Sequence, residues 1–139
     1  SNPTVDGPMR SLYMALKDAG LQASEIDYIN AHATSTPAGD SSEAKAIHEI
    51  FGAHKPFVSS TKSMTGHECW MAGASEVIYS MLMMQNGFLA PNINFENPDE
   101  DSAKLNIVKS DIEKDIVVFL SNSFGFGGTN SSLIIRKML

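Results

Sequence analysis

The sequence predicts an α/β fold with a mixed β-sheet, and three patterns support this prediction. Segments with the apolar spacing of helices alternate with short apolar runs typical of strands along the first two thirds of the chain. The final third holds three more such runs and no helical pattern, which indicates an antiparallel end added to the sheet. One helical segment near the middle is apolar on every side, and such a helix is normally buried.

The first expected element is an amphipathic helix over residues 5–19, which Gly20 follows as a stop signal. Its apolar residues recur at helical spacing: Met9, Leu12, Tyr13 and Leu16. A short apolar run at residues 26–31 then predicts a strand, and the turn-forming residues 34–40 predict a loop after it.

The second helix is expected to begin at Asp40 and to end at Phe51, before Gly52. Asp40 and Glu43, three residues later, resemble a capping box, a motif that contributes about 1 kcal/mol to helix stability. Residues 57–60 then form a second short strand.

The third helix covers residues 69–84, carries apolar side chains all around, and ends before Gly87. Full burial of such a helix needs a layer on each side, and two packed sheets are the natural suppliers. The chain predicts too few strands to build both sheets. Glu76 lies inside this helix, where a carboxylate is costly unless paired, so we expect Lys62, a backbone amide or an ion beside it.

Three more strands are expected after a polar loop at residues 91–101, and the last two are joined by a glycine-rich loop. They cover residues 105–108, 116–121 and 132–136. Because the chain starts on a helix, we expect the first strand of the domain to be missing and the chain to be a fragment. Ser1 and Asn2 resemble the remnant of a protease-cleavage site, so the domain is expected to span residues 3–139.

Composition and charge exclude several classes of protein. At 139 residues one domain is expected, and 42% hydrophobic with 19% charged residues argues against disordered and fibrous chains. A net charge of -6 without a basic cluster argues against nucleic-acid binding. We expect neither a membrane span nor export, because the sequence shows no apolar run of membrane-spanning length and no signal-peptide pattern. The single cysteine excludes an internal disulfide, and a cytoplasmic location is expected.

Two of the four histidines lie where a strand meets a loop or a helix. His32 ends the first predicted strand, so a rigid element would hold its imidazole at the edge of a site. His67 precedes the apolar helix, whose N-terminus disfavours a charged imidazole and leaves a neutral donor. Two neutral imidazole N–H groups could form an oxyanion hole. Each histidine alone is equally compatible with a structural role.

Other uses of these residues stay open. The spacing of the histidines, including the expected surface residues His48 and His54, matches no zinc-ligand motif. Cys69 could pair with a histidine for thiol catalysis, although its place in the apolar helix favours a structural thiol. Lys62 could orient His67 or hold a carboxylate, although a lone lysine is usually solvated. Glycines flank Phe126 and would let its ring swing as a gate.

Four motifs in this order resemble the condensing enzymes of fatty-acid synthesis. They are HATSTP from His32, GD from Gly39, TKSMTGH from Thr61 and NSFGFGGTN from Asn122. The resemblance covers about residues 28–136 and is closest to the type I and II elongating β-ketoacyl-acyl-carrier-protein synthases of the thiolase superfamily. It implies the C-terminal half of a five-layer αβαβα sandwich, in which each half contributes one sheet and the apolar helix lies between the two.

The resemblance also implies catalytic roles. His32 and His67 would hold the carbonyl or enolate oxygen while malonyl-carrier-protein loses carbon dioxide, and Lys62 would support this pair. Two N–H donors aimed at a developing oxyanion can each be worth roughly 10²-fold to 10³-fold in rate. No cofactor is implied, because the phosphopantetheine arrives on the carrier protein.

Binding roles follow from the same resemblance. Thr34 and Thr36 would contact the phosphopantetheine arm, and Phe126, with Phe124 behind it, would gate the acyl pocket. Five further residues match positions that in relatives form a polar cluster, sometimes with a bound cation, although no metal is certain here: Asn30, Glu43, Glu76, Ser121 and Asn122.

The chain departs from the family pattern in two places. Ala33 replaces a usual glycine, and Trp70 and Met71 stand in a usual run of small residues, where they could reshape the acyl pocket. The family's acyl-accepting cysteine lies in an N-terminal half, and Cys69 is not its counterpart. Without that nucleophile no covalent acyl-enzyme forms, so this chain alone is expected to be inactive.

The sequence therefore predicts part of an acyltransferase that condenses an acyl group with malonyl-carrier-protein by decarboxylative Claisen chemistry in fatty-acid biosynthesis. The expected partners are the acyl carrier protein, the enzyme's own N-terminal half and a second copy in a homodimer. The main alternative is a non-catalytic ketosynthase-like subunit of the chain-length-factor type, against which the retention of His32, Lys62 and His67 speaks. A self-contained binding module would expose the apolar helix and should dimerise or aggregate.

Overall fold

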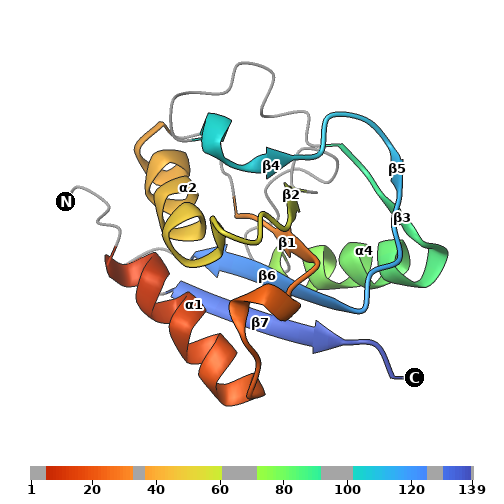
Figure 1. The fold of residues 1–139 in the computed structure, drawn as a ribbon, viewed down its shortest axis with the longest axis horizontal. Coiled ribbons are helices and arrows are strands. Elements are labelled where there is room, and N and C mark those ends of the chain that lie inside the picture. The colour runs from red at the N-terminus through yellow and green to blue at the C-terminus, as the bar shows by residue number, and fades with distance from the viewer. Residues whose placement is uncertain (1–5, 33–36, 61–71, 92–101, 125–129, 139) are drawn as a thin grey trace.

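The computed structural model describes residues 6–32, 37–60, 72–91, 102–124 and 130–138, and it places helices on both faces of a five-stranded sheet (Figure 1). Within these ranges the α-helices are α1 (Asp6–Ala19), α2 (Pro37–Phe51) and α4 (Ala72–Asn86). Short 3-10 helices are η1 (Ala23–Glu25) and η3 (Ser102–Lys104).

The main sheet has the strand order β4-β2-β1-β6-β7. Its first four strands are parallel to their neighbours, and β7 pairs with β6 in the antiparallel direction. Its strands are β1 (Tyr28–Asn30), β2 (Phe57–Ser59), β4 (Asn106–Ile107), β6 (Val118–Phe124) and β7 (Asn130–Arg136). The predicted α/β class, mixed sheet and antiparallel end are therefore confirmed.

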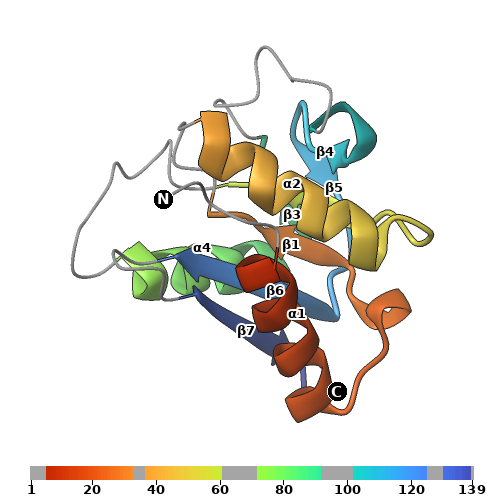
Figure 2. The same ribbon diagram turned by 90° about the vertical axis from the view of Figure 1, so that its left-hand side faces the viewer.

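Alternation along the strands divides the core between two helical layers (Figure 2). Leu120 packs with buried residues of α1 and α2, whereas its neighbour Phe119 packs with Met83 and Met84 of α4. Successive side chains of a strand point to opposite faces of the sheet. The pair α1 and α2 therefore covers one face, and α4 covers the other.

The side chains of α1 follow the predicted amphipathic pattern. Leu12 and Leu16 are buried, whereas Tyr13 and Met14 are exposed. The helix ends at Ala19, and the next residue, Gly20, has a φ of 68°, in the left-handed region that glycine adopts without strain. The Leu21 N–H then donates to the carbonyl oxygen of Leu16 at 3.1 Å, which satisfies an otherwise open helix end.

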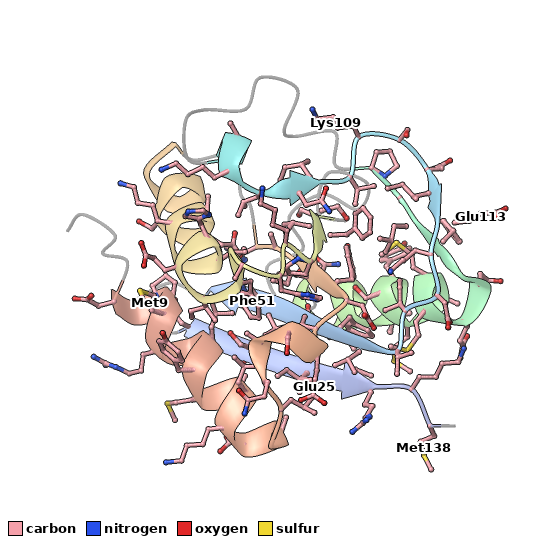
Figure 3. All side chains as sticks on the ribbon, viewed as in Figure 1. Met9, Glu25, Phe51, Lys109, Glu113 and Met138 are labelled. Carbon is pink, nitrogen blue, oxygen red and sulfur yellow. The ribbon has the colours of Figure 1, made fainter. Side chains whose placement is uncertain are left out.

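The N-terminus of α2 differs from the predicted one. The helix begins at Pro37, so Asp40 lies inside it and the capping box expected at Asp40 is wrong. Proline is favoured at the first helical position, because its fixed φ suits the helix and its missing N–H needs no partner there. The predicted C-terminus at Phe51 is confirmed, and the Phe51 side chain points into the core in Figure 3.

Helix α4 buries one face and exposes the other. Met83 and Met84 pack against the sheet, and Glu76 and Ser80 are also buried. The opposite face exposes large apolar side chains, namely Ile78, Tyr79, Met81 and Leu82. An apolar face of this kind on a helix is typical of a surface that another layer covers.

Two short strands were not predicted. They are β3 (Phe88–Leu89) and β5 (Ile112–Glu113), which form a separate antiparallel pair beside α4. Two residues are too few to produce a recognisable apolar alternation. Among the described residues, no helix combines the length and the apolarity that a membrane crossing requires.

Asp27 joins three strands at the amino end of the sheet. Its Oδ2 accepts hydrogen bonds from the backbone N–H groups of Val117 at 2.9 Å and Val118 at 3.0 Å. Its own N–H donates to the carbonyl oxygen of Val118, and its carbonyl oxygen accepts from the N–H of Phe57. One residue thus links β1 to both of its neighbours.

The phenol of Tyr28 is fully buried between the sheet and α4, and its hydroxyl shares a 2.6 Å hydrogen bond with Ser59. Burial raises the pKa of Tyr28 far above its ordinary value. The Ser59 hydrogen bond offsets part of this shift, and the nearby charge of Glu76 raises the pKa again. Tyr28 is therefore a neutral hydrogen-bonding group in the folded protein.

We expect Asp27→Ala to destabilise the protein by about 2–4 kcal/mol, because two backbone donors lose a charged acceptor. The free energy of unfolding in urea measures this loss. Asp111→Ala removes an exposed carboxylate and is expected to stay within about 0.5 kcal/mol of the parent. Equal stability of the two variants would show that Asp27 does not hold the strands together.

The raised pKa of Tyr28 predicts a pH dependence of stability. The phenol's contribution is fully present below the unfolded pKa of about 10 and is lost as the pH rises above it, by at most about 1.4 kcal/mol per pH unit. Tyr28→Phe should remove this part of the slope, measured by urea unfolding on both sides of that pKa. Tyr13→Phe, at an exposed ring, is the control, and an unchanged slope in Tyr28→Phe would refute the prediction.

Candidate active site

Three polar residues lie side by side where the parallel strands β1 and β2 end beside the middle of β6. Asn30 of β1 is in register with Ser59 of β2 and with Ser121 of β6, and all three are buried. In open parallel sheets, ligands bind at the carboxyl ends of the strands. The polar residues therefore mark this edge of the sheet as the candidate site.

A first polar group faces α4. The Asn30 side-chain amide donates to Ser80 Oγ at 2.8 Å, and Ser59 lies beside it with the Tyr28 hydroxyl. Glu76 is one turn before Ser80 on α4, is 1% exposed and is close enough to Tyr28 to affect its pKa. A carboxylate so deeply buried needs polar surroundings, which this end of the sheet supplies.

A second polar group faces α2 and is centred on Glu43, which is 3% exposed. Glu43 Oε2 accepts the backbone N–H of His32 at 2.7 Å and the side-chain N–H of Asn122 at 3.2 Å. Asn122 Oδ1 in turn accepts the hydroxyl of Ser132 at 2.7 Å. Glu43 thus joins α2 to the segment after β1 and to β6.

His32 is held by its backbone at this edge of the sheet. The N–H of Ala31 donates to the carbonyl oxygen of Ser59 at 2.8 Å, and the N–H of His32 donates to Glu43. The His32 residue itself is half-buried, two positions after Asn30 at the end of β1. A histidine on a rigid strand end with a fixed backbone is suited to a positional role in catalysis.

The structure brings together the described members of the predicted site. They lie at the carboxyl end of β1, in the middle of β6 beside it, or on the helix faces that cover these strands: His32, Asn30, Glu43, Glu76, Ser121 and Asn122. Phe124 is the last residue of β6. The remaining predicted residues lie outside the described ranges: Lys62, His67, Thr34, Thr36 and Phe126.

The polar side chains could suit a hard cation, because they offer oxygen ligands. They lie in two groups, one facing α2 and one facing α4. In the described part of the chain, no three His, Cys, Asp or Glu side chains lie close enough together to hold a metal ion.

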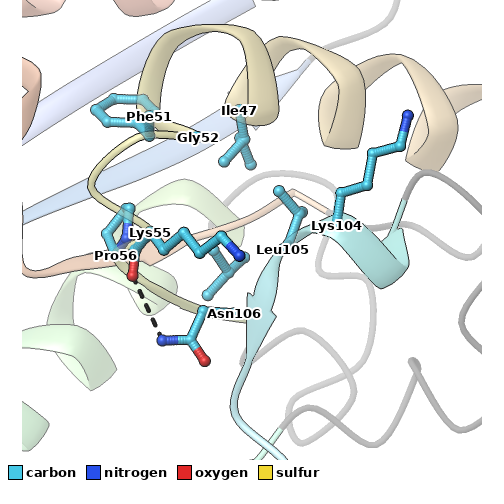
Figure 4. Close-up of a pocket in the computed structure, with 9 residues that line it drawn as sticks. Ile47, Phe51, Gly52, Lys55, Pro56, Lys104, Leu105 and Asn106 are labelled. Carbon is cyan, nitrogen blue, oxygen red and sulfur yellow. Dashed lines mark hydrogen bonds between the residues drawn. The ribbon is translucent and has the colours of Figure 1, made fainter.

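Two other features lie away from this edge. His54 is exposed, as predicted, and contacts the carbonyl oxygen of Ile26 at 3.1 Å, whereas His48 is half-buried on α2 rather than fully on the surface. A hollow of about 10 Å³ between α2 and β4 has room for about one water (Figure 4). Phe51, Pro56 and Leu105 line it near the amino end of β2, so it is not part of the candidate site.

Four residues of the polar groups were missed by sequence reasoning. Ser80 follows Glu76 by four residues and so shares its helix face, which was a usable signal. Ser59 is one of the last two residues of the predicted strand 57–60, which was a second signal. Tyr28 and Ser132 gave no such signal, because their roles depend on strand register.

Comparison of the sequence with known proteins identifies one family. The family model described as Beta-ketoacyl synthase, C-terminal domain, matches residues 1–96. The 3-oxoacyl-[acyl-carrier-protein] synthase 1 of Escherichia coli strain K12 is 48% identical over 136 residues, which are 98% of this chain and 33% of that relative. The chain thus spans about a third of the length of the curated relatives it matches.

Solved structures with a similar fold belong to ketosynthases. The ishigamide ketosynthase/chain length factor has a TM-score of 0.92 and 36% identity, covering 100% of this chain and 34% of that one. A ketosynthase bound to the hexaketide, in complex with a type II PKS acyl-carrier protein, has a TM-score of 0.90 and 33% identity, covering 100% of this chain and 35% of that one. These likenesses confirm the predicted thiolase-like α/β fold, and with the family match they show that the chain belongs to the β-ketoacyl synthase family as a C-terminal domain.

Proposed function

We propose that the intact protein containing this chain is a β-ketoacyl-acyl-carrier-protein synthase that extends an acyl group by decarboxylative condensation with malonyl-carrier-protein. One observation carries the proposal. The backbone of His32 is fixed at the carboxyl end of the parallel sheet by a 2.7 Å hydrogen bond to the buried Glu43. Catalysis by an oxyanion hole needs donors whose positions are set before the reaction begins.

In this reaction His32 is one of two imidazole donors. The TKSMTGH motif assigns the second donor to His67 and the support of this pair to Lys62. The carbon–carbon bond to the malonyl carboxylate breaks, carbon dioxide leaves, and the electron pair spreads onto the thioester oxygen as an enolate. The imidazole N–H groups stabilise that oxygen. The enolate carbon then attacks the acyl carbonyl held on the enzyme's nucleophile, and the thiolate leaves as the β-ketoacyl product forms.

The nucleophile is proposed to be a cysteine in the part of the synthase outside this chain. Cys69 lies two residues after His67, outside the motif, and is not assigned that role. The chain by itself is therefore proposed to be inactive. The alternative, a non-catalytic subunit of the chain-length-factor type, would use the same fold without decarboxylation.

The carrier protein and the rest of the synthase are the proposed partners. A structural relative is a ketosynthase in complex with an acyl-carrier protein, which supports the first of these. The exposed apolar face of α4, formed by Ile78, Tyr79, Met81 and Leu82, supports the second. We place the remainder of the synthase on this face, and we include a homodimer and a cytoplasmic location in the proposal.

His32→Ala in the intact synthase is expected to slow malonyl-carrier-protein decarboxylation by about 10²-fold to 10³-fold, because one oxyanion donor is lost. The release of carbon dioxide measures this rate. His54→Ala, at the exposed histidine after α2, is expected to decarboxylate at the parental rate. Parental decarboxylation by His32→Ala would reject the synthase assignment and favour the non-catalytic subunit.

If the rest of the synthase covers the apolar face of α4, truncating two side chains that are equally exposed in this chain should lower the free energy of unfolding by different amounts. Ile78 on α4 and Met14 on α1 are each 57% exposed. In the intact synthase, Ile78→Ala should cost about 2–4 kcal/mol, because it creates a cavity under the second layer, and Met14→Ala should cost about 0.5 kcal/mol or less. Chemical unfolding compares them, and equal costs would mean that α4 remains uncovered.

A further inference from the structure

A row of hydrogen bonds crosses the domain from the outer helix α1 to the backbone of His32. The hydroxyls of Ser11 on α1 and Ser132 on β7 are 2.7 Å apart. Ser132 donates to Asn122 Oδ1 at 2.7 Å, and Asn122 donates to Glu43 Oε2 at 3.2 Å. Glu43 accepts the N–H of His32 at 2.7 Å.

The direction of the protons along this row is determined. Ser132 gives its single hydroxyl proton to Asn122, so the hydrogen bond between the serines must use the proton of Ser11. Every donor between Ser11 and Glu43 therefore points toward the carboxylate. Hydrogen bonds aligned in this way polarise one another.

Glu43 decides which end of the Asn122 amide faces it, because a carboxylate accepts hydrogen bonds and donates none. A side-chain amide can turn over, and its oxygen and nitrogen ends are nearly equal in shape. The N–H end therefore faces Glu43, and the oxygen end is left to accept the hydroxyl proton of Ser132. Without that hydroxyl, the amide keeps its hydrogen bond to Glu43 but loses the one that holds its oxygen end in place.

We propose that Ser132 is a positioning residue for His32, acting through Asn122 and Glu43, with Ser11 as its outer support. The proposal rests on the proposed decarboxylation. Glu43 bonds directly to the backbone from which the His32 ring projects, so a shift of the carboxylate moves the ring. Small displacements of a catalytic donor have large effects on rate.

The test compares Ser132→Ala with Ser132→Thr in the intact synthase. Loss of the hydroxyl is expected to lower kcat for malonyl-carrier-protein decarboxylation by about 3-fold to 10-fold, while KM stays within about 2-fold. Acyl transfer onto the nucleophile, which precedes decarboxylation, should keep its rate. Threonine retains the hydroxyl and should restore decarboxylation.

Ser131→Ala is the matched control, because Ser131 is the neighbouring serine of β7 and is exposed. It should behave as the parent does. Ser11→Ala leaves β7 unchanged and should lose about 2-fold in decarboxylation, since it removes only the outer bond. This variant decides the question alone if Ser132→Ala does not fold, and a parental rate in it would then overturn the proposal.

The possible failures can be told apart. Parental decarboxylation by Ser132→Ala, with His32→Ala impaired, refutes the positioning role and leaves the proposed function standing. Equal losses in acyl transfer and decarboxylation, without rescue by threonine, also refute it, because a purely structural role predicts that pattern. Parental decarboxylation by His32→Ala rejects the proposed function itself.

Discussion

The buried carboxylate of Glu43 is the group on which the candidate site depends. A carboxylate removed from water is tolerated only with donors around it, and the described donors come from other elements of the fold. The backbone after β1 supplies one such donor, and Asn122 of β6 supplies another. Satisfying this one side chain therefore fixes α2 against the sheet and, in the same step, fixes the backbone of His32.

Much of the fold could be predicted because its pattern is local. The spacing of Leu12 and Leu16 identified α1, and short apolar runs identified the five strands of the main sheet. The start of α2 was missed because a plausible cap at Asp40 competed with Pro37, and turn-like residues before it concealed the first helical turn. The pair β3 and β5 was missed because two residues carry no period.

The candidate site, too, could be predicted only where the sequence carries local information. His32 and Asn30 could be placed at a strand end from sequence, and the resemblance to the family singled out Glu43 and Asn122. The hydrogen bonds among them could not be predicted, since Glu43 and Asn122 are 79 positions apart and meet only when β1 and β6 are neighbours. The roles of Lys62 and His67 stay predictions from their motif.

The antiparallel pairing of β6 with β7 has a consequence for how the domain tolerates change. Asn122 and Ser132 are directly opposite each other in that ladder. A slip of one residue would turn every β7 side chain to the other face and would set an exposed serine or a leucine against Asn122. Insertions or deletions within β7 should therefore damage the domain more than substitutions at its exposed positions do, although β7 is an edge strand in this sheet.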